Sequence, residues 1–219
     1  MTEELRKSII QTIALCLRTK FSSYTPKSNY MPFHHRLLGK DRYALYSFLH
    51  SLNTTFGQSV FEPIAISLAQ SKFTFAKSQY SVGNELYSNC SDVINQIMSD
   101  LEISKRSPDR MDEIRLLRDS LTGTKVPRDP TLVDLYMVDG NGKHWLFDMK
   151  SPKPNMGEFA GFKRTLLTWM GMAMTKDPNI SVSAMIAITY NPHYPGPYKS
   201  WQMRGMLERD EILDRKSVV

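Results

Sequence analysis

The first half of the chain has the hydrophobic pattern of helices. Apolar residues recur at spacings of three and four, which is typical of helices with one buried face, over residues 3–20, 41–56, 59–70 and 84–103. Residues 21–39, with their serines, prolines and tyrosines, predict a long loop. We therefore expect a mainly helical N-terminal part, residues 1–104.

The pattern changes to strands from residue 130. The stretch 130–155, PTLVDLYMVDGNGKHWLFDMKSPKPN, has two apolar-rich segments on either side of a Gly-Asn-Gly turn and predicts a β-hairpin. A long helix over 155–176, with Asn155 as N-cap and Glu158 at the capping-box position, and a buried strand over 181–190 follow. Shorter helices are expected over 109–121 and 201–216.

This order of elements predicts an α/β (α+β) fold. A hairpin, a crossover helix and a further strand give a mixed β-sheet flanked by helices, here residues 126–190, after the helical N-terminal part. No repeat or linker divides the chain, so residues 1–219 are expected to form a single domain. The apolar second half of the long helix, LLTWMGMAM, is expected to pack between layers or subunits.

Three charged residues of the hairpin form the candidate site. Strand side chains alternate faces, so Asp148 and Lys150 point one way, and the odd-numbered residues between 145 and 149 are expected to point into the core. Asp134 on the first strand shares their face only if it opposes Asp148. A three-residue loop, 140–142, with Gly142 left-handed, gives that register, and we predict it or an equivalent bulge.

Two opposed carboxylates require a cation. Two unit charges 4 Å apart repel by about 4 kcal/mol at an effective dielectric constant near 20. Oxygen ligands without nitrogen or sulfur favour Mg²⁺, which can polarise a phosphodiester and activate a bound water, with Lys150 beside it. The alternative is that Asp148 and Lys150 are surface residues beside a turn. An acid-x-Lys pattern alone is not specific, because the chain has a second one at Asp214 and Lys216.

Composition adds weaker constraints. The formal charge of +6 and the pI of about 9.2 are compatible with an anionic partner. Between residues 105 and 128, the sequence has seven basic and four acidic residues. This composition fits either a solvated helix with internal ion pairs or a phosphate-contacting strip. Cys16 and Cys90 lie in apolar helical patterns and are expected to be reduced thiols. Without a secretory pattern or a membrane-length apolar run, a cytoplasmic protein is expected.

The hairpin resembles the PD-(D/E)XK nuclease superfamily, and within it the type II restriction endonucleases. The matching residues are Pro130 and Asp134 in PTLVD and the run Asp148-Met149-Lys150. The segments VDLY, DMKSPKPN, FKRTLLTW and YNPHYPGPYKSW resemble the TdeIII group. The chain departs from the superfamily's pattern in two ways. Three residues separate Pro130 from Asp134, and Asp148 stands where glutamate is commoner.

The resemblance implies the roles of the site residues. Asp134 and Asp148 would bind Mg²⁺, helped by the Met149 carbonyl, and Lys150 would orient the attacking water. Further candidates are Glu62 and Lys163 for catalysis, and Arg128, Lys153, Lys199 and Arg204 for DNA contact.

The implied activity is site-specific hydrolysis of double-stranded DNA that leaves 5′-phosphate ends. A palindromic site would need a homodimer, with contacts expected from the Met-rich half of the long helix and the loop 191–198. A DNA methyltransferase would be the functional partner. The alternatives are a repair or junction nuclease of the same fold and a non-catalytic DNA-binding module.

Overall fold

The chain consists of two compact units. The computed structural model describes residues 2–25, 32–70, 72–150, 158–196, 198 and 205–213. The units are Met1–Leu68 and Ala69–Val219. The single-domain organisation expected from the sequence stays a prediction.

The N-terminal unit is helical, as predicted. It contains α1 (Glu3–Ser23), α2 (Pro32–Leu38), α3 (Lys40–Phe56), a π-helical turn η2 (Gly57–Phe61) and α4 (Glu62–Ala69). The hydroxyl of Thr2 caps α1 by accepting a hydrogen bond from the backbone N–H of Leu5 at 3.3 Å. The loop expected over residues 21–39 is wrong in part, because α1 runs to Ser23 and α2 lies within this stretch.

The C-terminal unit is built on a five-stranded mixed sheet. Its strands are β1 (Phe75–Ser81), β4 (Leu132–Val138), β5 (His144–Lys150), β6 (Val182–Ile188) and β7 (Ile212–Leu213), in the spatial order β1-β4-β5-β6-β7. The pairs β1–β4 and β4–β5 are antiparallel, and β5–β6 and β6–β7 are parallel. The predicted fold, a mixed sheet flanked by helices with a helical N-terminal part, is confirmed.

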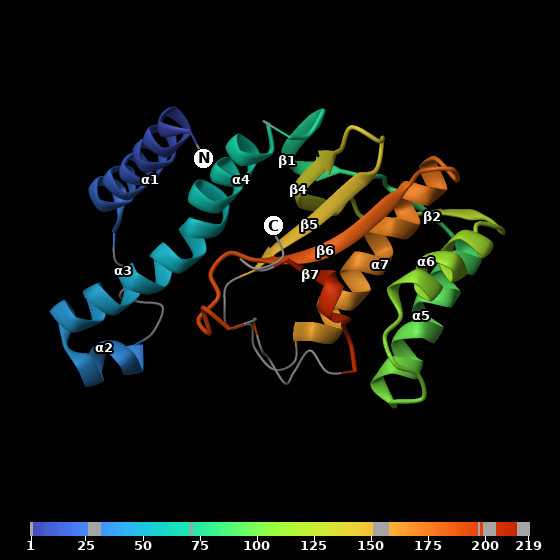
Figure 1. Ribbon diagram of the computed structural model, residues 1–219. Helices are drawn as coiled ribbons and strands as arrows, with labels where there is room; N and C mark the ends of the chain where they lie inside the picture. Colours follow the sequence, from blue (N-terminus) through green and yellow to red (C-terminus); the bar gives the residue numbers. More distant parts are fainter. Residues whose placement is uncertain are drawn as a thin grey trace. The chain divides into compact units, whose positions relative to one another are not determined.

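One helix connects the hairpin to the parallel part of the sheet. Figure 1 shows α7 (Glu158–Lys176) lying along the sheet, with α5 (Ser88–Glu102) and α6 (Arg110–Asp119) beside it. At Gly171, a Cβ atom would lie 2.8 Å from a methyl carbon of Leu86 and 3.0 Å from the Cys90 sulfur, so a larger residue there would require these side chains to shift.

Two expected helices differ in the structure. The strand β2 (Glu85–Tyr87) occupies the first turn expected of the 84–103 helix and pairs with β3 (Lys125–Pro127) in a small second sheet. Within 201–216, the described residues form a 3₁₀ turn, η4 (Arg209–Glu211), and then β7. Ile212 pairs with Ile186 at the edge of the parallel sheet, and the spacing of apolar residues in the sequence does not reveal this partner.

The hydrophobic core lies on the opposite face of β5 from the one expected. The main buried cluster contains Leu146 and Tyr136, together with Leu166, Leu167 and Met170 of α7. Trp145, Phe147 and Met149 do not belong to this cluster, because α7 crosses the other face. Phe147 is nevertheless buried.

The Met-rich half of α7 is part of this core. Met170, Met172 and Met174 are all at most 2% exposed. The prediction that this half-helix forms a dimer contact is therefore wrong, since its side chains are buried within their own unit. Among the described helices, none is long and apolar enough to cross a membrane.

Candidate active site

The hairpin loop has the predicted length and handedness. The strands pair from Val138 opposite His144 to Leu135 opposite Phe147. The backbone N–H of Asp139 donates to the Lys143 carbonyl at 3.0 Å, which leaves residues 140–142 as the loop, and Gly142 has a φ of 76°. Continued by one residue, this register puts Asp134 opposite Asp148. The predicted three-residue loop is confirmed.

The three candidate residues of the hairpin lie together. The Nζ atom of Lys150 is 2.8 Å from Oδ1 of Asp148 and 4.9 Å from the ring centre of Phe162 on α7. Asp134 is held through both oxygens: the backbone N–H of Met149 donates to Oδ2 at 2.9 Å, and the side-chain amide of Gln79 donates to Oδ1 at 3.3 Å. Gln79 could not be singled out from the sequence, because β1 shows little alternation of apolar and polar residues.

The surroundings of Asp148 are short of positive charge. Its side chain is 7% exposed, whereas that of Lys150 is 31% exposed. Burial raises the pKa of the Asp148 carboxyl to about 6, the Lys150 ammonium opposes this rise, and the neighbouring Asp134 adds to it. Lys150 therefore compensates the charge of the acidic pair only in part.

This donor set fits a hard divalent cation. Mg²⁺ is commonly held by one or two carboxylates, with waters and substrate phosphates as its other ligands. Asp134 and Asp148 supply two carboxylates, and each oxygen of Asp134 keeps a second acceptor position. No group of three His, Cys, Asp or Glu side chains suited to a metal ion occurs among the described residues. The contribution of the Met149 carbonyl stays a prediction.

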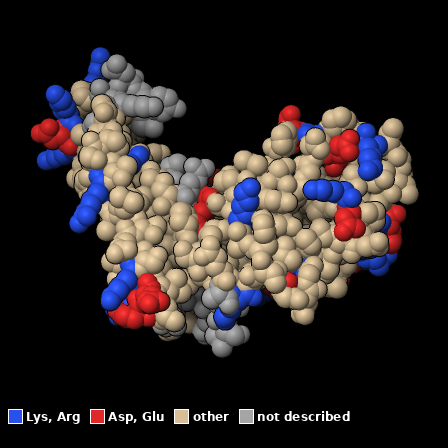
Figure 2. All heavy atoms as spheres, turned by 90° about the horizontal axis from the view of Figure 1, so that it is seen from above, with Lys and Arg blue, Asp and Glu red and all other residues tan. Residues whose placement is uncertain are grey.

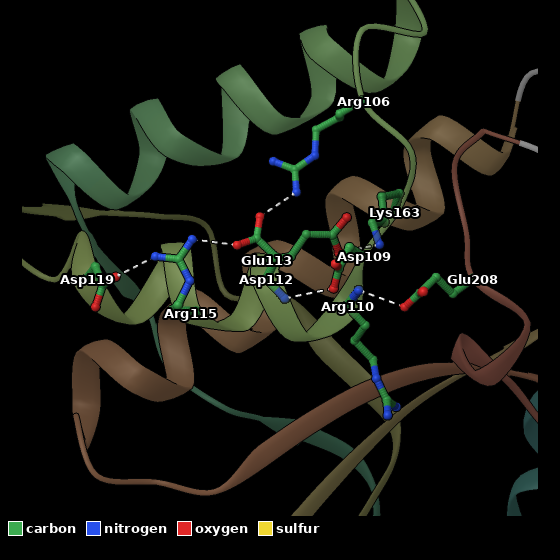
Figure 3. A network of polar contacts seen from close by, with 9 residues as sticks. All are labelled: Arg106, Asp109, Arg110, Asp112, Glu113, Arg115, Asp119, Lys163 and Glu208. Atoms are coloured by element: carbon green, nitrogen blue, oxygen red, sulfur yellow. Dashed lines mark hydrogen bonds and ion pairs between the residues drawn. The ribbon is translucent and has the colours of Figure 1, made fainter.

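The structure places Lys163 away from solvent. Its side chain is fully buried, with Nζ 2.5 Å from Oε2 of Glu113 and 2.6 Å from Oε1 of Glu211. Lys163 thereby joins α6, α7 and η4, and Figure 3 shows its contact with α6. The expected catalytic role is not supported, because this ammonium is enclosed between two carboxylates. Helical spacing could have indicated this, since Phe159 and Leu167, four residues to either side, are also buried.

The roles of the remaining candidates stay predictions. Glu62 is the first residue of α4 and is buried in the N-terminal unit, whereas the hairpin belongs to the other unit, so its role stays a prediction. Arg128 is exposed, and its guanidinium donates to the Ser91 hydroxyl of α5. Lys153, Lys199 and Arg204 lie outside the described residues.

The basic segment before the hairpin forms internal ion pairs. Arg106 and Arg115 contact Asp112 at 3.0 and 2.5 Å, and Arg115 also contacts Asp119 at 3.2 Å, as Figure 3 shows. Arg110 contacts Asp210 at 2.8 Å. Basic and acidic side chains also lie interspersed over the face drawn in Figure 2. Internal ion pairs are thus found at Arg106 and Arg115, as one of the two interpretations of this segment expects, and contact of the segment with phosphate stays a prediction.

Comparison with known proteins assigns the family. The model of one protein family, described as type II restriction endonuclease, HinfI, matches residues 1–215. The chain belongs to the HinfI family of type II restriction endonucleases. The hairpin with its candidate site therefore lies within the residues that match this family model. The resemblance to the TdeIII group remains untested.

One curated relative extends the comparison. The chain is 29% identical to the type II restriction enzyme MjaII of Methanocaldococcus jannaschii, over 98% of its own length. It spans 64% of the length of MjaII. No solved structure matches this HinfI-family chain at a significant level.

Proposed function

We propose that the protein is a site-specific endonuclease that hydrolyses double-stranded DNA with Mg²⁺. The observation that carries this proposal is the opposed pair Asp134 and Asp148 with Lys150 beside them, in a chain of the HinfI family. The name of the relative MjaII, a type II restriction enzyme, supports the same activity. Attack of water on phosphorus with breakage of the P–O3′ bond would leave a 5′-phosphate and a 3′-hydroxyl.

Each residue has a separate task in this proposal. Asp134 and Asp148 hold the cation, which when bound supplies Lewis-acid polarisation of the phosphodiester and a water of lowered pKa. The Lys150 ammonium, the more exposed partner of its ion pair, donates to the attacking water or to the phosphate oxygen that gains charge. The Met149 N–H holds the Asp134 carboxylate in place for this task.

The proposed partners follow from the substrate. A palindromic duplex presents two equivalent strands, so we propose a homodimer with one site for each strand. A DNA methyltransferase that protects the same sequence would be the functional partner. The excess of basic residues supports DNA as the ligand, with phosphate contacts that weaken as salt rises.

The test is digestion of phage DNA by the purified protein with Mg²⁺. Discrete bands whose ends carry 5′-phosphates are the expected result. Cleavage only of branched or damaged DNA would instead identify a repair or junction nuclease. Binding of DNA without any cleavage, in Mg²⁺ and in Mn²⁺, would identify a non-catalytic module.

A further inference from the structure

Gln79 lies directly opposite Asp134 on the neighbouring strand. In the β1–β4 pairing, Ser78 opposes Leu135 and Tyr80 opposes Val133, so residue 79 faces residue 134. The Gln79 amide donates to Oδ1 of Asp134 at 3.3 Å in a partly buried position. Gln79, Asp134 and Asp148 thus form one row across three adjacent strands.

The backbone of Gln79 is strained. Its φ is 49°, and among the described residues only Ser104 is another non-glycine residue with positive φ. Ser104 follows the end of α5, where a left-handed residue is common. Gln79 instead lies within β1, and the pairing register is the same on both sides of it, so no inserted residue explains its conformation. Strain of this kind persists where the surroundings impose it, and it is often found at active sites.

The contacts of Asp134 suggest what this conformation achieves. One oxygen accepts from the Met149 backbone and the other from the Gln79 amide, so β5 and β1 hold the carboxylate from two sides. Asp148, in contrast, is held by the charged Lys150. A neutral amide orients Asp134 without cancelling the negative charge that a cation needs.

We propose that Gln79 is a positioning residue for Asp134, which its amide holds in the orientation that binds the metal ion. The left-handed backbone at residue 79 turns this amide towards the carboxylate. This inference rests on the proposed function, and it adds a residue that the family resemblance did not supply. A purely structural hydrogen bond between two strands is the competing explanation.

The matched pair Gln79→Gly and Ser104→Gly separates these explanations. Both changes remove backbone strain, so both proteins are expected to melt within a few degrees of the wild type. Gln79→Gly also removes the amide, and loss of a partner that orients a metal ligand typically costs about 10–100-fold in metal affinity or activity. We expect a loss of that size in kcat, with KM for DNA unchanged, and no change in Ser104→Gly.

A second readout does not depend on cleavage. Calorimetric titration with Mn²⁺ alone should show weaker binding to Gln79→Gly than to the wild type or to Ser104→Gly. Equal Mn²⁺ affinity and equal kcat in all three proteins would overturn the inference while leaving the nuclease assignment intact. A lowered melting temperature of Gln79→Gly with unchanged Mn²⁺ affinity would show a structural role and would also overturn it. Wild-type protein that binds Mn²⁺ but cuts no DNA would contradict the proposed function instead.

Discussion

The lysine–carboxylate contacts of Lys150 and Lys163 differ in their access to solvent. Lys150 pairs with Asp148 and is 31% exposed, whereas Lys163 lies fully buried between Glu113 and Glu211. An ammonium that reaches solvent can exchange its carboxylate for a substrate phosphate. A fully enclosed ammonium has its charge compensated within the fold, so Lys163 serves packing, whereas the role proposed for Lys150 is in binding.

The enclosed cluster makes stability depend on pH. Burial raises the pKa of the Glu113 carboxyl to about 6, Lys163 opposes this rise and Glu211 adds to it. In the unfolded chain, the pKa of a glutamate is about 4.3. The folded protein therefore binds this proton more tightly than the unfolded chain. The free energy of unfolding rises as the pH falls from about 6 towards about 4.3, and this gain disappears when the pH rises through about 6 again.

Substitution of Glu113 by glutamine should remove the part of this dependence that comes from Glu113. At about 1.4 kcal/mol for each pKa unit, the wild type should gain about 2 kcal/mol over the variant between pH 7.5 and pH 4.5. Urea unfolding of both proteins at the two pH values measures this change. A difference between wild type and Glu113→Gln that stays the same at both pH values would contradict the assigned environment of Glu113.

At the scale of elements, the hairpin loop decides whether a site exists. A shift of one residue in pairing would turn Asp134 to the opposite face from Asp148. Gly142, with its φ of 76°, supplies the left-handed residue that this loop needs. The acidic pair therefore depends on the backbone freedom of one glycine, six residues before Asp148.

Substitution of Gly142 by alanine tests this dependence. A Cβ at Gly142 or at Gly140 would have no atom within 4 Å, so neither alanine causes a clash. The left-handed conformation costs a non-glycine residue about 1–2 kcal/mol, and Gly142→Ala should lose that amount in free energy of unfolding. Gly140, without a positive φ, provides the control, and its alanine variant should lose less. Equal losses in the two variants would mean that the loop does not rely on a left-handed Gly142.

The sequence allowed the local parts of the site to be predicted. The Gly-Asn-Gly turn and the alternation around it were enough to place Asp134 opposite Asp148. They did not predict which face α7 would cover, because both faces of β5 carry apolar residues. The partners of Lys163 could not be predicted either, since Glu113 and Glu211 lie 50 and 48 residues away along the chain and only the tertiary fold brings them together.

At the scale of the whole molecule, assembly remains to be tested. The contact expected from the Met-rich half of α7 is excluded by its burial, whereas the argument from the symmetry of the substrate does not depend on that helix. Light scattering at working concentration should give twice the 25.2 kDa of one chain without DNA, and two chains in each particle after the mass of bound DNA is subtracted. A mass of one chain under both conditions would contradict the dimer.

The central claim is that Asp134, Asp148 and Lys150 form the site of phosphodiester hydrolysis. Lys150→Ala tests it most directly, with Lys143→Ala as the matched control. Lys143 lies next to the loop at the other end of the hairpin, with its Nζ atom 4.1 Å from the ring centre of Trp145. Both variants should be confirmed as folded by their melting curves before they are assayed.

The measurement is cleavage of phage DNA in Mg²⁺ beside a gel shift of the same DNA in Ca²⁺. Lys150→Ala should cut at least about 100-fold more slowly than the wild type, because it lacks the group that acts on the water or the developing charge. Its binding in Ca²⁺ should stay close to that of the wild type, and Lys143→Ala should both bind and cut. Cleavage by Lys150→Ala at nearly the wild-type rate would contradict the assignment of this site.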